Sequence, residues 1–359
     1  MTVTTLGVPV VPREREPAPS RPPSEGPLVD SYGRAATDLR VSLTDRCNLR
    51  CTYCMPAAGL PWLAAAELLQ PDEIGRVVRI AVTRLGVTKV RFTGGEPLLA
   101  KDLDAVVAAT AALRPRPEIA LTTNGVLLAE RAEALARAGV DRVNVSLDSV
   151  DSTHFSVITR RDRLTQVLAG LAAASAAGLR PVKVNAVLDP SSGLDDVVAL
   201  VRFCLAHDYQ LRIIEQMPLD AGHHWQRQTM VTAEQTLAEL RGHGFTVDPD
   251  DSPRGAAPAA IWRVADSATG RAGQVGIVAS VSEPFCSTCN RTRVTADGQL
   301  RSCLFATEET DLRALLRAGA DDDAIEAAWR AAMWDKPAGH GINDAHFVQP
   351  QRSMSAIGG

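Results

Sequence analysis

The feature that most constrains the fold is a regular alternation of strand-like and helix-like segments beginning at Asp38. Short β-branched runs recur as DLRVSLT, KVRFTG, EIALTTNG, RVNVSLDS, VKVNAVL and LRIIEQM, separated by Ala/Leu-rich segments such as PDEIGRVVRIAVTRLG and DLDAVVAATAAL. Six strand–helix units predict an α/β fold in which helices cover a parallel sheet. Because a closed barrel of this type needs eight units, we expect a partial, open TIM-like (β/α)6 barrel over residues 31–220.

The alternation stops after about Ala221, which predicts a small α+β unit over residues 221–345 that closes the barrel mouth. AAIWRVA and GQVGIVAS are typical of strands, and TRVTADGQLRSCLF of a hairpin that turns at Asp297-Gly298. Two Ala-rich helices follow, and residues 346–359 form a polar tail ending in Gly358-Gly359. Residues 1–30 are rich in proline and charge, so we expect a disordered extension there.

The composition limits the classes of partner. A net charge of −4 argues against a general nucleic-acid binder, so an anionic substrate would need a local group of Lys and Arg. No apolar run approaches the roughly 18 residues of a membrane span. The N-terminal MTVTTLGVPV lacks the pattern of an export signal. We therefore expect a cytoplasmic protein that binds neither nucleic acid nor membrane.

Six of the seven cysteines form two triads, and the first triad has the spacing C-x3-C-x2-C at Cys47, Cys51 and Cys54. Clustered cysteines in a reducing compartment are more often metal ligands than disulfides. Three thiolates can hold three irons of a [4Fe–4S] cluster and leave the fourth iron open, whereas complete protein ligation uses four. A structural zinc site that recruits a His is the alternative. The seventh cysteine, Cys204, is interpreted as a small buried hydrophobe.

A later GGEP stretch, Gly94-Gly95-Glu96-Pro97, supports the iron–sulfur interpretation. It is not a phosphate-binding P-loop, because Ala100 stands where the second glycine belongs. Together with the triad and Tyr53, this stretch resembles the radical S-adenosylmethionine (SAM) superfamily. The resemblance implies that SAM chelates the open iron and is cleaved to a 5′-deoxyadenosyl radical, and that the GGEP loop contacts the methionyl group of SAM.

The second triad is Cys286-x2-Cys289-x13-Cys303, on both sides of the expected hairpin. His340 and His346 are candidates for a fourth ligand by their position in the chain. Arg291 and Arg293 alternate on a strand and should point to one face, an arrangement that suits a triphosphate. Two surface arginines on a hairpin remain the simpler alternative.

Both triads and the terminal Gly-Gly together resemble the GTP 3′,8-cyclase family of molybdenum cofactor biosynthesis (molybdenum cofactor biosynthesis protein A) over Asp38 to Gly359. The resemblance implies two [4Fe–4S] clusters. It further implies that the radical abstracts the 3′ hydrogen of GTP, that the C3′ radical attacks C8 of guanine, and that the product is (8S)-3′,8-cyclo-7,8-dihydroguanosine 5′-triphosphate. In the same family the open iron of the second cluster is expected to bind the purine. An external electron donor, a homodimer and transfer of the product to cyclic pyranopterin monophosphate synthase are also implied.

The resemblance assigns roles to individual residues. GTP contacts are implied for Arg40, Arg91, Thr122, Lys183, Arg291, Thr292 and Arg293. SAM contacts are implied for Tyr53, Gly94, Gly95, Glu96, Ser146 and Met217. Catalytic roles are implied for Cys47, Cys51, Cys54, Lys183, Arg291, Arg293, Gly358 and Gly359. Lys183 also stands out on chemical grounds, because a lysine in the apolar run PVKVNAVL is costly to bury without a partner.

Three other functions remain possible at this stage. The first is another two-cluster radical SAM enzyme that modifies a peptide, although such enzymes with a related C-terminal module typically carry more cysteines. The second is a non-catalytic iron–sulfur or zinc protein, which would leave GGEP unexplained. The third is a nucleic-acid-modifying radical enzyme, which the acidic net charge disfavours.

Overall fold

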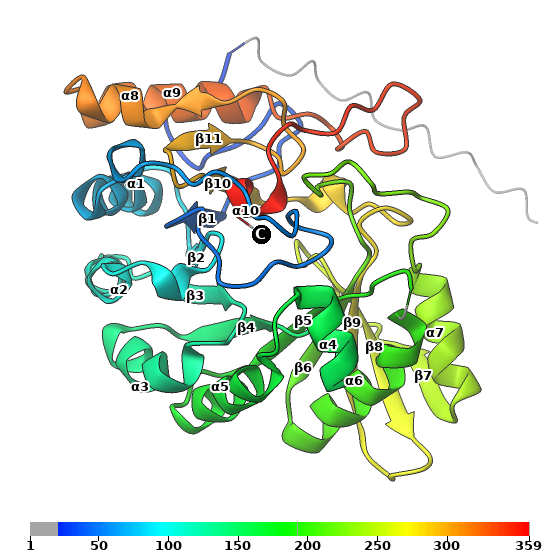
Figure 1. Cartoon of the computed structure of the whole chain (residues 1–359). Helices are drawn as coiled ribbons and strands as arrows, with labels where there is room; N and C mark the ends of the chain where they lie inside the picture. Colours follow the sequence, from blue (N-terminus) through cyan, green and yellow to red (C-terminus); the bar gives the residue numbers. More distant parts are fainter. Residues whose placement is uncertain (1–20, 192, 359) are drawn as a thin grey trace, which may run out of the picture.

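The computed structural model describes residues 21–191 and 193–358, which form an α/β fold around one twelve-stranded sheet. The strand order is β12-β11-β10-β1-β2-β3-β4-β5-β6-β9-β8-β7. The sheet curves, and helices α1, α2, α3, α5 and α6 lie along its outer side, while the C-terminal end lies inside the curve (Figure 1). Two strands at the ends of the order, β12 and β7, have one neighbour each, so the sheet is open.

The six strand–helix units predicted from the alternation are confirmed as parallel neighbours. Their strands are β1 (Asp38–Ser42), β2 (Lys89–Thr93), β3 (Glu118–Thr123), β4 (Arg142–Ser146), β5 (Lys183–Val187) and β6 (Gln210–Ile214). The outer helices are α1 (Pro71–Thr83), α2 (Leu103–Ala111), α3 (Leu128–Ala138), α5 (Leu164–Ala176) and α6 (Gly193–His207), whereas the short α4 (Ser152–Thr159) packs against the loop after β1. Most strand residues are buried, as expected for a parallel sheet with its outer face covered by helices.

The C-terminal part of the chain extends this sheet at both ends and does not form a sheet of its own. Strand β10 (Arg291–Val294) pairs parallel with β1, and its antiparallel hairpin partner β11 (Gln299–Arg301) continues to β12 (Thr310–Asp311). At the other end, β9 (Ala272–Val278) pairs parallel with β6, followed by β8 (Ala260–Asp266) and β7 (Phe245–Pro249). The expected second unit is therefore continuous with the barrel in its hydrogen bonding.

Four helices belong to this C-terminal part: α7 (Ala233–Gly242), α8 (Leu312–Arg317), α9 (Asp322–Trp334) and α10 (Met354–Ile357). Single turns of 3-10 helix occur at Ala65–Glu67, Pro97–Leu99 and Cys286–Thr288. Helix α9 packs its buried face on the sheet, with Trp329 fully buried. Among the described residues, no helix is long and apolar enough to cross a membrane.

The last residues of the predicted N-terminal extension are ordered, although the composition predicts disorder up to residue 30. Residues 1–20 lie outside the described part of the chain, but the segment just before β1 packs on the core. Leu28 is fully buried, and Asp30 forms a buried ion pair with Arg34 at 2.6 Å. The expected disorder is thus wrong for residues 28–30, because the buried leucine, the paired carboxylate and backbone hydrogen bonds such as that from the Leu28 amide to the Leu85 carbonyl hold this short segment.

Replacing Leu28 should show that this segment contributes to stability. We expect Leu28→Ala to lower the free energy of unfolding by about 2–5 kcal/mol, through lost apolar burial and a residual cavity. Tyr32→Ala, at a half-exposed position of the same segment, should change it by less than about 1 kcal/mol. Urea denaturation followed by circular dichroism measures both variants. Equal effects would mean that the segment is not part of the core.

Candidate active site

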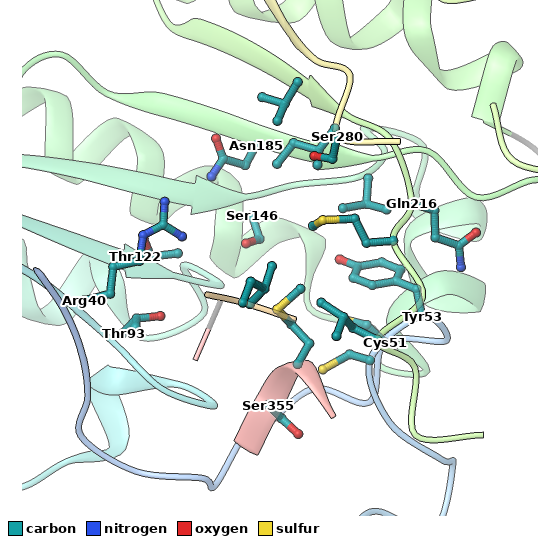
Figure 2. Close-up of a pocket in the computed structure, with 18 of the residues that line it drawn as sticks. Arg40, Cys51, Tyr53, Thr93, Thr122, Ser146, Asn185, Gln216, Ser280 and Ser355 are labelled. Atoms are coloured by element: carbon teal, nitrogen blue, oxygen red, sulfur yellow. The ribbon is translucent and has the colours of Figure 1, made fainter. Parts of the chain in front are cut away.

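A cavity of about 320 Å³ lies where the parallel strands end, and all six clustered cysteines line it. The carboxyl ends of parallel strands meet at one edge of a sheet, so loops that are distant in sequence converge there. Figure 2 shows Arg40 and Thr122 on one side of the view and Cys51 and Tyr53 on the other. The cavity therefore has an arginine-rich region and a sulfur-rich region.

The first triad lies in the loop after β1. The Cys47 sulfur accepts hydrogen bonds from the Leu49 amide at 3.4 Å and the Asn124 side chain at 3.7 Å. Burial raises the pKa of Cys51 and raises that of Cys54 to about 12. These three half-buried cysteines line one cavity, and a bound metal would stabilise their thiolates. The triad thus fits an iron–sulfur cluster.

The GGEP loop crosses the start of the cysteine loop at very close range. A Cβ atom at Gly94 would lie 2.4 Å from the Thr44 carbonyl oxygen, and one at Gly95 would lie 2.4 Å from that of Arg46. The Gly95 amide donates to the same Thr44 carbonyl at 2.7 Å. Only glycine permits this approach, which explains the two glycines structurally. Both glycines also line the cavity.

Glu96 is fully buried and does not line the cavity. Its carboxylate accepts hydrogen bonds from the Thr123 hydroxyl and the Asn124 and Leu98 amides, although burial raises its pKa to about 7. The side chain therefore joins the ends of β2 and β3. A SAM contact through the Glu96 side chain stays a prediction. In the structure, the Glu96 carboxylate holds the GGEP loop against the end of β3.

Three further residues predicted to contact SAM line the same cavity: Tyr53, Ser146 and Met217. The Tyr53 hydroxyl donates to Asp148 at 2.8 Å, and the Val187 amide donates to the other oxygen of that carboxylate at 2.8 Å. Burial raises the pKa of Asp148 to about 6. The sequence analysis missed Asp148, although it lies in the polar SLDS stretch directly after β4.

The arginine-rich region is the most unusual part of the cavity electrostatically. Arg40, Arg91, Arg291 and Arg293 all line the cavity, and their only ion pair with a carboxylate among the described residues is from Arg91 to Asp38, at 3.8 Å. The Nε atoms of Arg40, Arg91 and Arg291 are buried without a hydrogen-bond partner. Burial, together with Arg293 and Arg91, lowers the pKa of Arg40 well below its usual value. Buried cations with unused donors favour an anionic ligand.

A further arginine in this region was missed from the sequence. Arg212 on β6 lines the cavity, and burial, with Arg91 and Arg142 nearby, lowers its pKa to about 10. The sequence contains a signal for Arg212, because this residue alternates with the buried Leu211 and Ile213 in LRII. Arg91 alternates in the same way with Val90 and Phe92 in VRF. The arginines thus come from strands at both ends of the six-unit core.

Two predicted GTP contacts lie outside the cavity lining. Lys183 opens β5, and its pKa is lowered to about 7 by burial first and then by Arg212, Arg142 and Arg91. Thr292 is fully buried between two cavity arginines, and its hydroxyl accepts a hydrogen bond from the Trp329 indole at 3.0 Å. The Thr292 side chain therefore faces α9, which leaves its main chain for the predicted contact. Thr122 lines the cavity as expected.

The second triad lines the same cavity as the first. Cys286 and Cys289 precede β10, and Cys303 follows β11. Burial would raise the pKa of Cys289, but Lys336 and Arg291 beside it lower the value to about 7. In the described part of the chain, no three His, Cys, Asp or Glu side chains surround a single-ion position. The triad fits a cluster in its donor type and in the positive charge around it.

The two histidines proposed as fourth ligands do not complete this triad. The His340 ring lines the cavity, but its Nε2 lies 2.9 Å from the Ser280 carbonyl oxygen and its Nδ1 accepts from the Ile342 amide at 3.1 Å. His346 is exposed and does not line the cavity. The candidate role of both histidines is therefore not supported by this arrangement.

The C-terminal tail enters the same region, as its inner position in Figure 1 shows. The Ser42 hydroxyl donates to the Ile357 carbonyl at 3.0 Å, and Arg293 donates to the Gly358 carbonyl at 3.0 Å. Gly358 has φ of 88°, and a Cβ there would overlap the Ser42 side chain, so no other residue fits without movement. Gly359 lies outside the described residues.

Comparisons with known proteins agree with this site. Residues 41–204 match the Radical SAM superfamily model, and residues 209–342 match the Molybdenum Cofactor Synthesis C model. The chain is 68% identical, over the full length of both proteins, to "GTP 3′,8-cyclase" of Mycolicibacterium smegmatis and to "GTP 3′,8-cyclase 2" of Mycobacterium tuberculosis. Among solved structures, Streptococcus suis SuiB bound to its precursor peptide has a TM-score of 0.57 at 15% identity, covering 88% of this chain and 68% of that one, which supports the fold alone.

A cysteine triad and a glycine loop at the carboxyl edge of an open α/β sheet define a radical SAM enzyme, which uses SAM and a [4Fe–4S] cluster. The full-length identity then places the chain within one family of that class. The chain belongs to the GTP 3′,8-cyclase family and is an enzyme of molybdenum cofactor synthesis. The zinc and peptide-modifying alternatives are thereby set aside.

The close approach at the glycine loop generates a test. Gly95→Ala should weaken SAM binding at least about tenfold, because the new Cβ would collide with backbone carbonyls of the cysteine loop and displace it. Gly75→Ala, in α1 with open space around it, is the matched control and should leave SAM affinity unchanged. Anaerobic equilibrium dialysis with SAM measures both variants. Unchanged affinity in Gly95→Ala would contradict the close-contact role.

Proposed function

We propose that the chain converts GTP to (8S)-3′,8-cyclo-7,8-dihydroguanosine 5′-triphosphate through one cavity shared by two iron–sulfur clusters, SAM and the nucleotide. GTP is the substrate that the family's activity requires. The observation that carries the shared-cavity proposal is the convergence of both cysteine triads and the buried arginines. The cavity that both triads line would hold the two small molecules.

Cys47, Cys51 and Cys54 would hold the cluster at which SAM binds. That cluster, when bound and reduced, supplies the reductive cleavage of SAM to methionine and a 5′-deoxyadenosyl radical. Gly94, Gly95, Ser146, Met217 and Tyr53 border this part of the cavity and would orient SAM. The Tyr53–Asp148 hydrogen bond fixes the tyrosine ring in that wall.

The arginine-rich region would bind the triphosphate. Arg40, Arg91, Arg291 and Arg293 together match the roughly four negative charges of GTP, and the unused Nε donors of the first three would gain acceptors. Arg212, and Lys183 near the lining, add positive charge from β6 and β5. Holding the phosphates there would direct the ribose and purine toward the triads. Orientation of this kind is a large part of what a protein adds to cofactor chemistry.

Cys286, Cys289 and Cys303 would hold a second [4Fe–4S] cluster whose open iron takes the purine of GTP. The tail would close the site from the side of β1, since Ser42 and Arg293 anchor its last carbonyls. A closed site excludes water and oxygen from radical intermediates. A homodimer, an external electron donor and transfer of the product to cyclic pyranopterin monophosphate synthase complete the proposal.

Separate cysteine variants test the two triads. With anaerobically reconstituted protein, SAM, reductant and GTP, we expect Cys47→Ala to abolish both 5′-deoxyadenosine and the GTP isomer, because SAM has no cluster to bind. Cys286→Ala should keep SAM cleavage but lose the isomer by at least about a hundredfold, because the purine is not positioned. Mass spectrometry detects both products.

The isolated thiol Cys204, buried away from the cavity, provides the control, and Cys204→Ala should retain both products. Formation of 5′-deoxyadenosine with GTP returned unchanged by the wild-type chain would refute the substrate assignment. Formation of the isomer by Cys286→Ala would refute only the role of the second triad and would leave the substrate assignment intact.

The lowered pKa of Lys183 predicts that GTP binding depends on pH. Without ligand its pKa is about 7, lowered chiefly by burial, and a nearby triphosphate should raise it, so binding takes up a proton. The Kd of the wild-type chain should therefore rise by up to about tenfold per pH unit above about pH 7. Lys183→Arg stays charged and should lose this dependence, while the titration of GTP itself is common to both proteins. Calorimetry across pH makes the comparison, and parallel profiles would exclude Lys183 from the phosphate site.

A further inference from the structure

Lys336 is a buried lysine just after α9. It belongs neither to the cysteine triads nor to the arginine-rich region of the cavity. Its side chain is nearly inaccessible, with 3% of the residue exposed. The ammonium group donates to the Arg291 carbonyl at 2.9 Å, the Cys289 carbonyl at 3.3 Å and the Cys289 sulfur at 3.4 Å. All of its contacts therefore converge on the segment that carries the middle cysteine of the second triad.

Lys336 lies beside the Cys289 sulfur without a carboxylate partner of its own. No carboxylate of the described residues forms an ion pair with Lys336, and Arg291 places a second positive charge beside Cys289, its guanidinium donating to the Cys289 sulfur at 3.6 Å. A buried ammonium group is costly unless an anion compensates it. Among the described residues, the one side-chain atom that accepts a hydrogen bond from the Lys336 ammonium group is the Cys289 sulfur, which is a candidate cluster ligand.

The position of Lys336 is fixed by a clamp built on Arg34. This guanidinium donates to the Cys286 carbonyl at 2.8 Å, the Pro337 carbonyl at 2.7 Å and the Ala338 carbonyl at 2.8 Å. Its Nε pairs with the buried Asp30 at 2.6 Å. The chain on either side of the Lys336–Cys289 contact is thus tied to the segment before β1, and the ammonium group cannot move away easily.

We propose that Lys336 is a positioning residue of the second cluster, and that its hydrogen bond to the Cys289 sulfur and its positive charge raise the reduction potential of the cluster that this triad holds. The inference rests on the proposed second cluster. Hydrogen bonds to the ligating sulfurs and the net charge around a cluster are the main protein determinants of its potential. Adding an electron beside a fixed positive charge is more favourable than adding it without one.

Two variants separate the charge of Lys336 from its hydrogen bonds. Lys336→Gln keeps an N–H donor but removes the charge, whereas Lys336→Arg keeps the charge. Lys101→Gln removes a charge from an exposed lysine and is the matched control. Each full-length chain is reconstituted anaerobically, its iron is counted, and an electron paramagnetic resonance redox titration follows both clusters. Cys286→Ala identifies the signal of the first cluster.

We expect Lys336→Gln to lower the midpoint potential of the second cluster, or to lose about half of the bound iron, with the first cluster and SAM cleavage unchanged. Lys336→Arg and Lys101→Gln should retain both clusters, with potentials close to those of the wild-type chain. Equal potentials and iron in Lys336→Gln and wild type would overturn the inference. Equal loss in the Gln and Arg variants would also overturn it, because the role would then be purely structural.

Failure of the proposed function gives a different result. In that case the wild-type chain itself would bind about four irons, and Cys286→Ala would not reduce that number. A wild-type chain with about eight irons and an unresponsive Lys336→Gln leaves the two-cluster enzyme intact and removes only the role of Lys336.

Discussion

The parallel register of β10, β1 and β2 is the constraint on which the site depends. Arg40 on β1 is directly opposite Arg91 on β2 and Arg293 on β10, so three guanidinium groups form one row across three hydrogen-bonded strands. Like charges placed side by side on a sheet are destabilising. Hydrophobic burial elsewhere in the sheet must offset this repulsion, and a bound polyanion would relieve it. The row thus explains how a chain with a net charge of −4 can attract a nucleotide.

The same register explains why the two triads share one cavity. The first triad follows β1, and the second triad brackets the hairpin whose first strand pairs with β1. Arg291 and Arg293 alternate along β10, whereas Thr292 between them turns to Trp329 on the other face. One parallel pairing therefore brings the two cysteine triads and the arginines of β1 and β10 to one cavity.

Much of this could be predicted from the sequence, because it depends on local patterns. Strand–helix periodicity predicted the six parallel units, the Asp297-Gly298 pair predicted the β10–β11 hairpin, and cysteine spacing predicted the first cluster. The attachment of the C-terminal strands to both ends of the sheet was not predictable, since the partners in the β1–β10 and β6–β9 pairings, such as Asp38 with Arg291 and Leu211 with Val275, are far apart in the chain and leave no local signal. His340 illustrates the same limit, because its ring nitrogens are occupied by groups that sequence position does not reveal.

The residues that sequence reasoning missed share one physical property: their partners are distant in the chain. Arg212 follows the alternation of its own strand, but its neighbours Arg91 and Arg142 are far from it in the chain, as Tyr53 is from Asp148. Arg34 and Lys336 lie about 300 residues apart, and they contact Cys286 and Cys289 of the second triad. Motifs supply the groups that bind cofactors, whereas the surrounding charges come from wherever the fold brings them. Because charges and hydrogen bonds around a metal site tune its properties, residues outside the motifs are expected to control part of the chemistry.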